Sequence, residues 1–557
     1  MKAKRLTYCL RRTILRVVPV FLCLWALPSQ ALFRDFAFEK DSSAWFSGCN
    51  AAGLTRYSGT TITAAEVYGQ LQRGGFVNYD QSPKTIEAGA AVESFYRLSS
   101  RTVVYGRMGY DNYSGRDMAG SAFINAERRP FDIVEDSVTN LGRKHLDTYS
   151  LVGAVGVDLW RGVALGARVG YTSANYAKYK DLRHKNLYMD LDVTAGMTAP
   201  LGRWGTLGAN YRYRRNTESL EFSTYGKGDK VYKSLVGYAV FTGKVEQFGG
   251  DGFTDSNTSM PLLDEHHGLH VQLELRPADG IAWYQEASLA WREGYYGRRS
   301  PYTIQYTRHE SKVYTYLSRL DYRCQTSAHH LDVSLEAENL VNKLNTYREL
   351  KNEAGSHYYE YYDPVKASNK VWVNGSVAYT GYWGLVGSKA RPSETTKHQP
   401  ATLPTWTLHA AFSWKHRKQT AYVYPYYRRQ KLDQHELSLS VGRNLFFRQS
   451  LLTLTAGASF GKGSGEPFED GTYISPSDKQ TPPPMMDTWL YREYEYLTAS
   501  QRLLSFSAKY SFHIPTTSFP AFIAITAQHR KAHKPEHREY LAGTDRTLLR
   551  LAVGCVF

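Results

Sequence analysis

KNLYMDLDVTAGMTAP, residues 185–200, is the stretch that decides the fold. Apolar residues occupy every second position from Leu187 to Met197, and polar residues, tyrosine or glycine occupy the positions between them. A β-strand sends successive side chains to opposite faces, so a period of two separates these two kinds, whereas a helix would mix them. The stretch therefore predicts a strand with one apolar and one polar face.

The same alternation recurs along the chain, for example in residues 163–172, 207–214, 269–276 and 331–338. Several of these predicted strands are longer than the about 5–6 residues usual in globular proteins. Short turns, such as residues 99–101 and 201–203, join them in pairs, and long polar segments separate the pairs. Short turns at one end and long loops at the other are typical of outer-membrane barrels.

Counting the turns predicts an all-β fold, a closed antiparallel transmembrane β-barrel of about 18 strands within a range of about 14–20. The count takes Arg417-Lys418 as a tight turn and places residues 371–383 in an outer loop; a strand there would raise it to about 20. The composition agrees. A barrel needs apolar residues only at alternate positions, where side chains face lipid, so the mean hydropathy of −0.46 is compatible with it. The 43 tyrosines are compatible with the aromatic girdles that such barrels carry at the two membrane interfaces.

The two ends of the chain predict export and assembly. Residues 1–16 hold six basic residues and no acidic residue, residues 17–27 are apolar, and small residues precede Ala31. This predicts a signal peptide over 1–31, a leader over 32–65 for which the lumen is a candidate position, and an outer-membrane barrel over 66–557. The last strand resembles the signal read by the barrel assembly machinery, with alternate apolar residues before a terminal aromatic: Leu551, Val553, Cys555 and Phe557.

No residues predict catalysis, a cofactor or a metal site, so the chain is predicted not to be an enzyme. Cleavage would leave Cys49, Cys324 and Cys555, an odd number without metal-type spacing. Histidines 266, 267 and 270 are interpreted as solvated residues at a strand end. Removing the first 16 residues lowers the formal net charge from +16 to +10, and the remaining basic residues are scattered, which argues against nucleic acid.

Three segments resemble a family of uncharacterised Bacteroidota outer-membrane β-barrels, classed as a domain of unknown function. They are Asn50-Ala51-Ala52-Gly53-Leu54, Arg129-Pro130-Phe131 with residues 135–137, and residues 177–186. Leu182 stands where that family has proline. The resemblance implies the fold and the location and brings no activity.

Residues 43–56 also resemble the N-terminal segment of the long-chain fatty acid transporter family, in which a similar motif forms a hatch inside the barrel. Ala51 stands where that family has proline. The resemblance implies a candidate hatch at residues 50–54: Asn50, Ala51, Ala52, Gly53 and Leu54. The alternative interpretation is a polar leader resting in the lumen.

The leading hypothesis is a passive channel or transporter for an unidentified small solute, in contact with outer-membrane lipid. Mixed charge on the polar strand faces would filter solutes without chemistry. The alternatives are a non-conducting component of an envelope or secretion complex and a hatch-gated transporter of hydrophobic molecules. The sequence sets no oligomeric state. The predicted lumen lining is Asp190, Asp192, Arg212, Arg214, Glu336 and Glu338.

Overall fold

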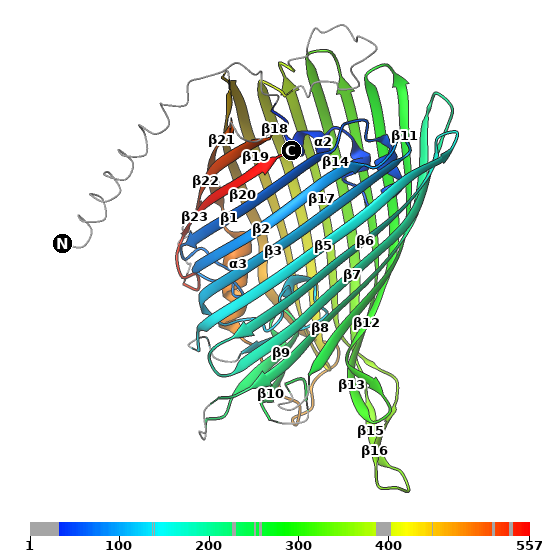
Figure 1. Ribbon diagram of the computed structural model, residues 1–557. Helices are drawn as coiled ribbons and strands as arrows, with labels where there is room; N and C mark the ends of the chain where they lie inside the picture. The colour runs from blue at the N-terminus through cyan, green and yellow to red at the C-terminus, as the bar shows by residue number, and fades with distance from the viewer. Residues whose placement is uncertain are drawn as a thin grey trace, which may run out of the picture.

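The computed structural model describes residues 33–135, 138, 140–225, 230–249, 252–254, 259–385, 403–447, 449–514, 519–533 and 539–557. They form a closed barrel of 18 antiparallel strands (Figure 1). The barrel closes between its first and last strands, where Val67 lies opposite Val553. The fold class and the strand number predicted from the sequence are confirmed. The predicted signal peptide lies outside the described residues.

Each barrel strand pairs with the next one along the barrel wall. In chain order the strands are β1 (Ile62–Arg73), β2 (Lys84–Arg97), β3 (Thr102–Met118), β5 (Gly142–Trp160), β6 (Val163–Lys178), β7 (Arg183–Pro200), β8 (Gly205–Ser223), β11 (Met260–Ala278), β12 (Ile281–Ser300), β13 (Thr303–Arg323), β14 (Ser327–Leu344), β17 (Val365–Trp383), β18 (Trp406–Val423), β19 (Tyr426–Phe446), β20 (Ser450–Thr472), β21 (Gln501–His513), β22 (Pro520–Ala532) and β23 (Asp545–Val556).

The strand count was correct because two errors cancelled. Residues 371–383, predicted to lie in an outer loop, belong to β17 and pair with β14 and β18. Arg417-Lys418, predicted to be a tight turn, lies inside β18, which continues to Val423. The turn follows at Tyr424-Pro425. A pair of basic residues in a long strand has no turn-forming chemistry, and the pattern alone did not distinguish it from a hairpin loop.

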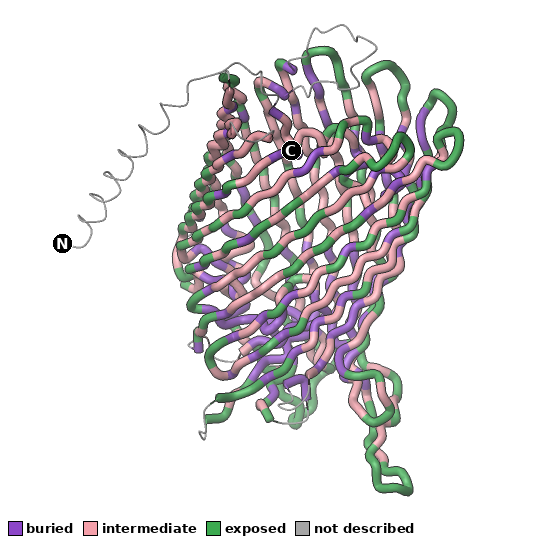
Figure 2. Tube along the Cα trace, in the orientation of Figure 1, coloured by how far each residue is buried: buried purple, intermediate pink, exposed green. Residues whose placement is uncertain are grey.

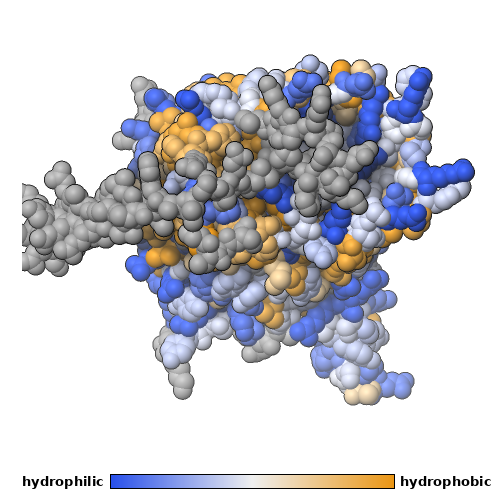
Figure 3. All heavy atoms as spheres, turned by 45° about the horizontal axis from the view of Figure 1, so that its top comes forward, coloured by the Kyte–Doolittle hydropathy of each residue, from blue (hydrophilic) through white to orange (hydrophobic). Residues whose placement is uncertain are grey.

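The outer wall of the barrel is apolar. On β7, Leu187 and Met197 are 54% and 46% exposed, whereas Thr194 on the other face is buried. The apolar residues of β23 point outward in the same way, and Phe557 is 52% exposed. Hydrophobic residues gather on the wall, while the protruding loops are mostly hydrophilic (Figure 3). Such a wall is stable only against lipid, as in outer-membrane barrels.

The leader folds inside the barrel at the end where the short turns lie, here named the turn end (Figure 1). It comprises α2 (Phe36–Asp41), η2 (Ala44–Phe46) and η3 (Ala51–Arg56), and β1 begins at Ile62 rather than at the predicted residue 66. Side chains cap these short helices: Asp35 accepts a hydrogen bond from the Phe38 amide, and Asn50 accepts one from the Ala52 amide. Among the described residues, no helix is long and apolar enough to cross a membrane.

The opposite end, here named the loop end, is filled by loops that fold inward and form the loop plug. The plug consists of the described residues of 119–141, 224–259 and 473–500. It contains η4 (Ala126–Arg128), α3 (Asp487–Thr498) and a three-stranded sheet of β4 (Asp132–Glu135), β9 (Lys233–Ala239) and β10 (Thr242–Gln247). Its core is fully buried and includes Phe131, Leu235 and Trp489. Figure 2 shows buried residues gathered inside the barrel near this end.

A separate hairpin, β15 (Tyr347–Lys351) and β16 (His357–Tyr361), projects beyond the loop end. In outer-membrane barrels the long loops face the outside and the short turns face the periplasm. On that rule the leader lies at the periplasmic end, and the loop plug and this hairpin lie at the outer end.

Candidate functional site: a lumen occupied at both ends

A row of glycines on the inner wall forms the seat of the leader. Gly156, Gly166 and Gly196 lie directly opposite one another on β5, β6 and β7. A Cβ atom on Gly166 would lie 2.0 Å from the backbone nitrogen of Ala52, and one on Gly156 would lie 2.6 Å from the Ala51 carbonyl oxygen. Only glycine leaves room for the backbone of η3 at these positions. The glycine-rich inner face of the strands is therefore a groove that fits the leader.

Polar side chains hold η3 in this groove. The Asn50 Nδ2 donates hydrogen bonds to Gln272 Oε1 at 3.0 Å and to the Met197 carbonyl at 3.1 Å. Asn50 is 2% exposed, so both bonds are shielded from water. Residues 50–54, the predicted hatch, thus lie against the inner face of the wall, and Ala51, Ala52, Gly53 and Leu54 are all buried.

Trp45 extends the contact from η2 to β11. Its Nε1 donates a hydrogen bond to Glu274 Oε2 at 2.5 Å, and Arg56 approaches the same carboxylate at 3.1 Å. The Arg56 guanidinium also lies 5.1 Å from the centre of the Trp45 ring, within the range of a cation–π contact. Trp45 is 2% exposed. Around Trp45, the leader is therefore held both by apolar packing and by an ion pair.

The rest of the leader reaches strands around the barrel. Lys40 pairs with Glu93 of β2 at 2.7 Å. Asp41 pairs with Arg319 of β13 at 2.9 Å and accepts a hydrogen bond from Tyr382 of β17. These contacts come from widely separated strands, so the leader spans the lumen.

The loop plug is fixed to the wall by buried ion pairs around Arg129. Its guanidinium contacts Glu218 of β8 at 2.5 Å and Asp264 of β11 at 3.2 Å. Asp264 also pairs with Arg292 of β12 at 2.7 Å. All four side chains are at least nine-tenths buried. A second plug contact, from α3, joins Glu493 to Arg417 of β18 through two hydrogen bonds.

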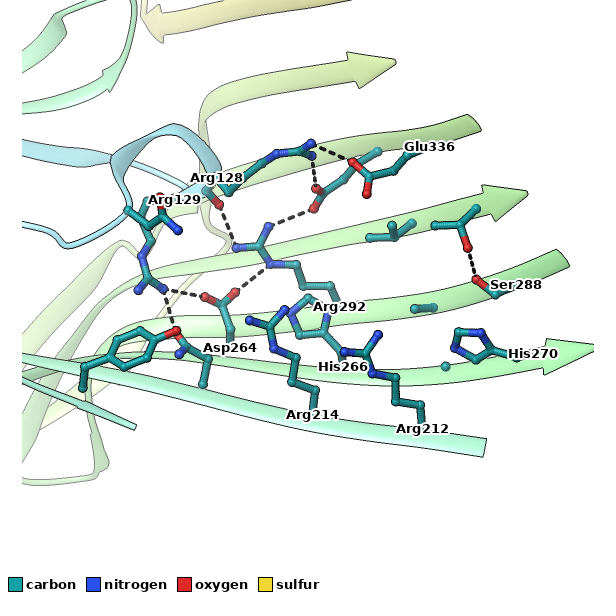
Figure 4. Close-up of a pocket in the computed structure, with 18 residues that line it drawn as sticks. Arg128, Arg129, Arg212, Arg214, Asp264, His266, His270, Ser288, Arg292 and Glu336 are labelled. Carbon is teal, nitrogen blue, oxygen red and sulfur yellow. Dashed lines mark hydrogen bonds and ion pairs between the residues drawn. The ribbon is translucent and has the colours of Figure 1, made fainter. Parts of the chain in front are cut away.

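Two adjacent cavities, lined mainly by charged and polar residues, lie between the leader and the loop plug. The first has a volume of about 370 Å³ and the second about 650 Å³. Figure 4 shows arginines from the plug and from β8 and β12 pointing into the first cavity. The two cavities share the same stretch of wall, which includes Arg212 and Glu336.

The residues predicted to line the lumen form three charged pairs or clusters. Arg212 pairs with Asp192 at 2.7 Å, and Arg214 pairs with Asp190 at 2.6 Å. Glu336 and Glu338 contact Arg128 of η4 at 2.6 and 3.2 Å. Arg212, Arg214, Glu336 and Glu338 line the first cavity. Charges on the wall are thus matched to one another or to the plug.

Sequence reasoning missed one cluster. Cys49 of the leader, His270 of β11 and Glu286 of β12 bring a thiol, an imidazole and a carboxylate together at the second cavity. The interpretation of His270 as a solvated strand-end residue was wrong, because it is 8% exposed in the middle of β11. Residues 49, 270 and 286 are far apart in the chain, and only the position of the leader in the lumen joins them.

Asp80, in the loop between β1 and β2, provides a pH-dependent contact of the plug. Its Oδ1 is buried and has no hydrogen-bond partner among the residues that the structure describes. Burial, together with the carboxylates of Asp132 and Glu493, raises the pKa of Asp80 to about 6, and Lys144 opposes this shift. The folded-state pKa of Asp80 lies above its unfolded value of 3.8, so stability falls as the pH rises from about 4 to about 6, and the full loss is present above about pH 6.

We therefore expect Asp80→Asn to raise the unfolding temperature by a few degrees at pH 7 and to change it little at pH 4, where the native carboxyl is already protonated. The measurement is thermal unfolding of the purified barrel in detergent at both pH values. Asp478→Asn, at an exposed carboxylate in the loop after β20, is the control and should change the unfolding temperature at neither pH. An Asp80→Asn gain that is the same at both pH values would contradict the assignment.

Residues 51–557 of the chain match the model of a family described as a family of unknown function (DUF6850). A comparison with curated proteins finds no match. Among solved structures, BauA, the ferric preacinetobactin receptor from Acinetobacter baumannii, is 10% identical at a TM-score of 0.36, with 89% of this chain and 79% of that chain covered.

Two other solved structures give similar values. The outer membrane transporter YddB from Escherichia coli is 8% identical at a TM-score of 0.36, covering 88% of this chain and 80% of that chain. A TodX deltaS2S3 mutant, a monoaromatic hydrocarbon channel, is 8% identical at a TM-score of 0.29, covering 95% of both chains. The family match spans the leader groove, the plug and all 18 strands, and the chain belongs to the family of unknown function DUF6850.

Proposed function

We propose that this protein is a gated outer-membrane transporter for a small polar solute, and that the leader moves to open the periplasmic end. The observation that carries the proposal is the pair of polar cavities between the leader and the loop plug. A barrel that served only as a membrane anchor would need no such chamber. A permanently open pore would not fill both ends of its lumen.

The lining of the cavities favours a polar solute. Arg168, Arg212 and Glu286 line the second cavity beside Cys49 of the leader. An apolar solute would have to displace water from these charged groups without replacing their hydrogen bonds, which is unfavourable. A hatch-gated route for hydrophobic molecules needs an apolar pocket at this position. A polar solute can instead form hydrogen bonds with the wall while it passes.

The attachment of the leader favours movement of the leader over movement of the wall. The wall is a continuous ladder of hydrogen-bonded strands, and opening it would break many backbone bonds at once. The leader is held by side-chain contacts, and the short segment 57–61 joins it to β1. Its ion pairs and hydrogen bonds, of about 1 kcal/mol each, can be exchanged for contacts with water or solute, and its buried apolar side chains can separate from wall residues such as Phe95 without breaking any strand pairing.

A disulfide between the leader and the wall tests this proposal. The Cys49 Sγ lies 3.4 Å from Asn210 Nδ2 of β8, so Asn210→Cys places a second thiol beside the native one. We expect the oxidised variant in proteoliposomes to block swelling in small sugars and amino acids, and reduction to restore it. The wild type, which has Asn210, should respond to neither treatment.

Equal swelling of the oxidised and reduced variant, with the cross-link verified, would contradict movement of the leader. The absence of swelling in every sample, the wild type included, would instead favour the non-conducting component of an envelope complex. In that case the loop plug and the hairpin of β15 and β16 would be the surface that contacts partner proteins.

A further inference from the structure

The cluster at the second cavity has the composition of a transition-metal site. The Cys49 Sγ lies 3.6 Å from His270 Nδ1 and 4.0 Å from Glu286 Oε1, and the last two atoms are 2.9 Å apart. All three ligand atoms lie within 4.8 Å of one another. Ligand atoms around a tetrahedral Zn²⁺ lie about 3.3–3.7 Å apart, given bonds of about 2.0–2.3 Å. An ion therefore fits after small shifts of the three side chains.

The geometry does not fit a catalytic relay. In a cysteine–histidine–acid relay, the thiol contacts one ring nitrogen and the carboxylate orients the ring through the other. Here the thiol of Cys49 and the carboxylate of Glu286 both approach Nδ1 of His270. Three different donor atoms that converge on one point are instead the arrangement of a metal site.

Neighbouring groups hold the ligands in place. The Tyr284 hydroxyl donates a hydrogen bond to Glu286 Oε2 at 2.7 Å, which leaves Oε1 directed at the cluster. Such an outer contact orients a metal-binding carboxylate. Arg168 and Arg212 line the same cavity and repel a cation, but both approach the carboxylate of Asp192, at 3.6 and 2.7 Å. That pairing reduces their repulsion.

We propose that Cys49, His270 and Glu286 bind one Zn²⁺ or a similar divalent transition metal. The thiol loses its proton to solvent when the ion binds. Three protein ligands leave a fourth position open, and all three ligands line the second cavity. A small solute with an anionic or nitrogen donor group can occupy that position. Because Cys49 belongs to the leader and the other two ligands belong to the wall, the ion also links the leader to the barrel.

Metal titration of the full mature chain in detergent tests the proposal. With Co²⁺ as the probe, we expect one ion per barrel and a near-ultraviolet thiolate-to-cobalt absorption band, which Zn²⁺ abolishes by competition. Cys49→Ser should abolish the band and weaken Zn²⁺ binding about a hundredfold or more. Glu286→Gln preserves the shape of the side chain and should weaken binding with the band still present. Cys324→Ser, at an exposed cysteine outside the cluster, should change neither quantity.

Heat-modifiable electrophoretic mobility verifies that each variant remains a folded barrel. A folded wild type that gives no thiolate band would overturn the proposal, and so would a band that survives in Cys49→Ser. The result does not depend on transport. If the barrel binds metal but passes no solute, the metal site stands and the proposal of a gated transporter is contradicted.

Discussion

Gly166→Ala should release the leader from its groove and make the barrel permeable. A methyl group at this position would lie 2.0 Å from the Ala52 nitrogen and 2.3 Å from the Ala51 carbonyl carbon. Both are backbone atoms, so no side-chain rotation relieves the overlap, and η3 must leave the wall. We expect proteoliposomes with this variant to swell in small sugars well above the wild-type rate, and Cys49 to react faster with a thiol reagent.

Gly170 lies on the same face of β6 as Gly166 and provides a matched control. A Cβ on Gly170 would meet Asp192 Cβ at 3.5 Å, an ordinary contact, and no atom of the leader within 4 Å. Gly170→Ala should therefore leave permeability and Cys49 labelling at wild-type values. Labelling is measured in a Cys324→Ser background, because Cys324 is exposed. If Gly166→Ala and Gly170→Ala gave the same permeability and the same labelling rate, the leader would not be the element that closes the turn end.

Arg129→Ala should release the loop plug. Removal of the guanidinium takes from the fully buried Glu218 its only ion pair among the described residues, whereas Asp264 keeps Arg292. Breaking a buried pair from one side costs about 3–5 kcal/mol, because the remaining charge stays out of water. We expect the amides of residues 119–134 to exchange with solvent about a hundredfold faster or more. Hydrogen exchange read by mass spectrometry measures this change.

Arg128, the preceding residue, is the control for Arg129. It also bears two carboxylate contacts. Its side chain and that of Glu336 are 35% and 39% exposed, and water screens this pair, which is worth about 1 kcal/mol or less. Its second partner, Glu338, is 6% exposed but keeps its ion pair with Arg292 when the Arg128 side chain is removed. Arg128→Ala should therefore leave exchange in the plug nearly unchanged. Equal acceleration in the two variants would show that burial of Arg129 does not fix the plug.

The sequence predicted the barrel well because one physical rule governs its wall. Every strand must present apolar side chains to lipid on one face, so the period of two survives even where insertions change the loops. The rule identifies strands but does not say how they connect. Residues 371–383 alternate like the other strands, with Val371 and Val373 on one face and Asn374 on the other. They were misplaced because every connection at the turn end was expected to be tight, whereas residues 384–405 join β17 to β18 there. Arg417-Lys418, taken as a turn inside β18, gave the error that cancelled this one.

The contents of the lumen were less predictable. The period of two identifies an inner face but does not say whether that face contacts water or protein. The row Gly156, Gly166 and Gly196 was visible as a glycine-rich face, yet its fit to Ala51 and Ala52 depends on strand register. The cluster of Cys49, His270 and Glu286 depends on where the leader lies. Three-dimensional packing, rather than local pattern, sets both.

The short connection between the leader and β1 makes the leader an intramolecular ligand of its own barrel. A segment tethered by a few residues samples its binding groove at an effective concentration in about the millimolar range. A solute that competes for the same wall must therefore bind tightly or arrive at high concentration before the leader dissociates. Lengthening residues 57–61 would lower that effective concentration and leave every contact in the groove intact, so under the proposed movement of the leader the tether alone can set the opening threshold of the barrel.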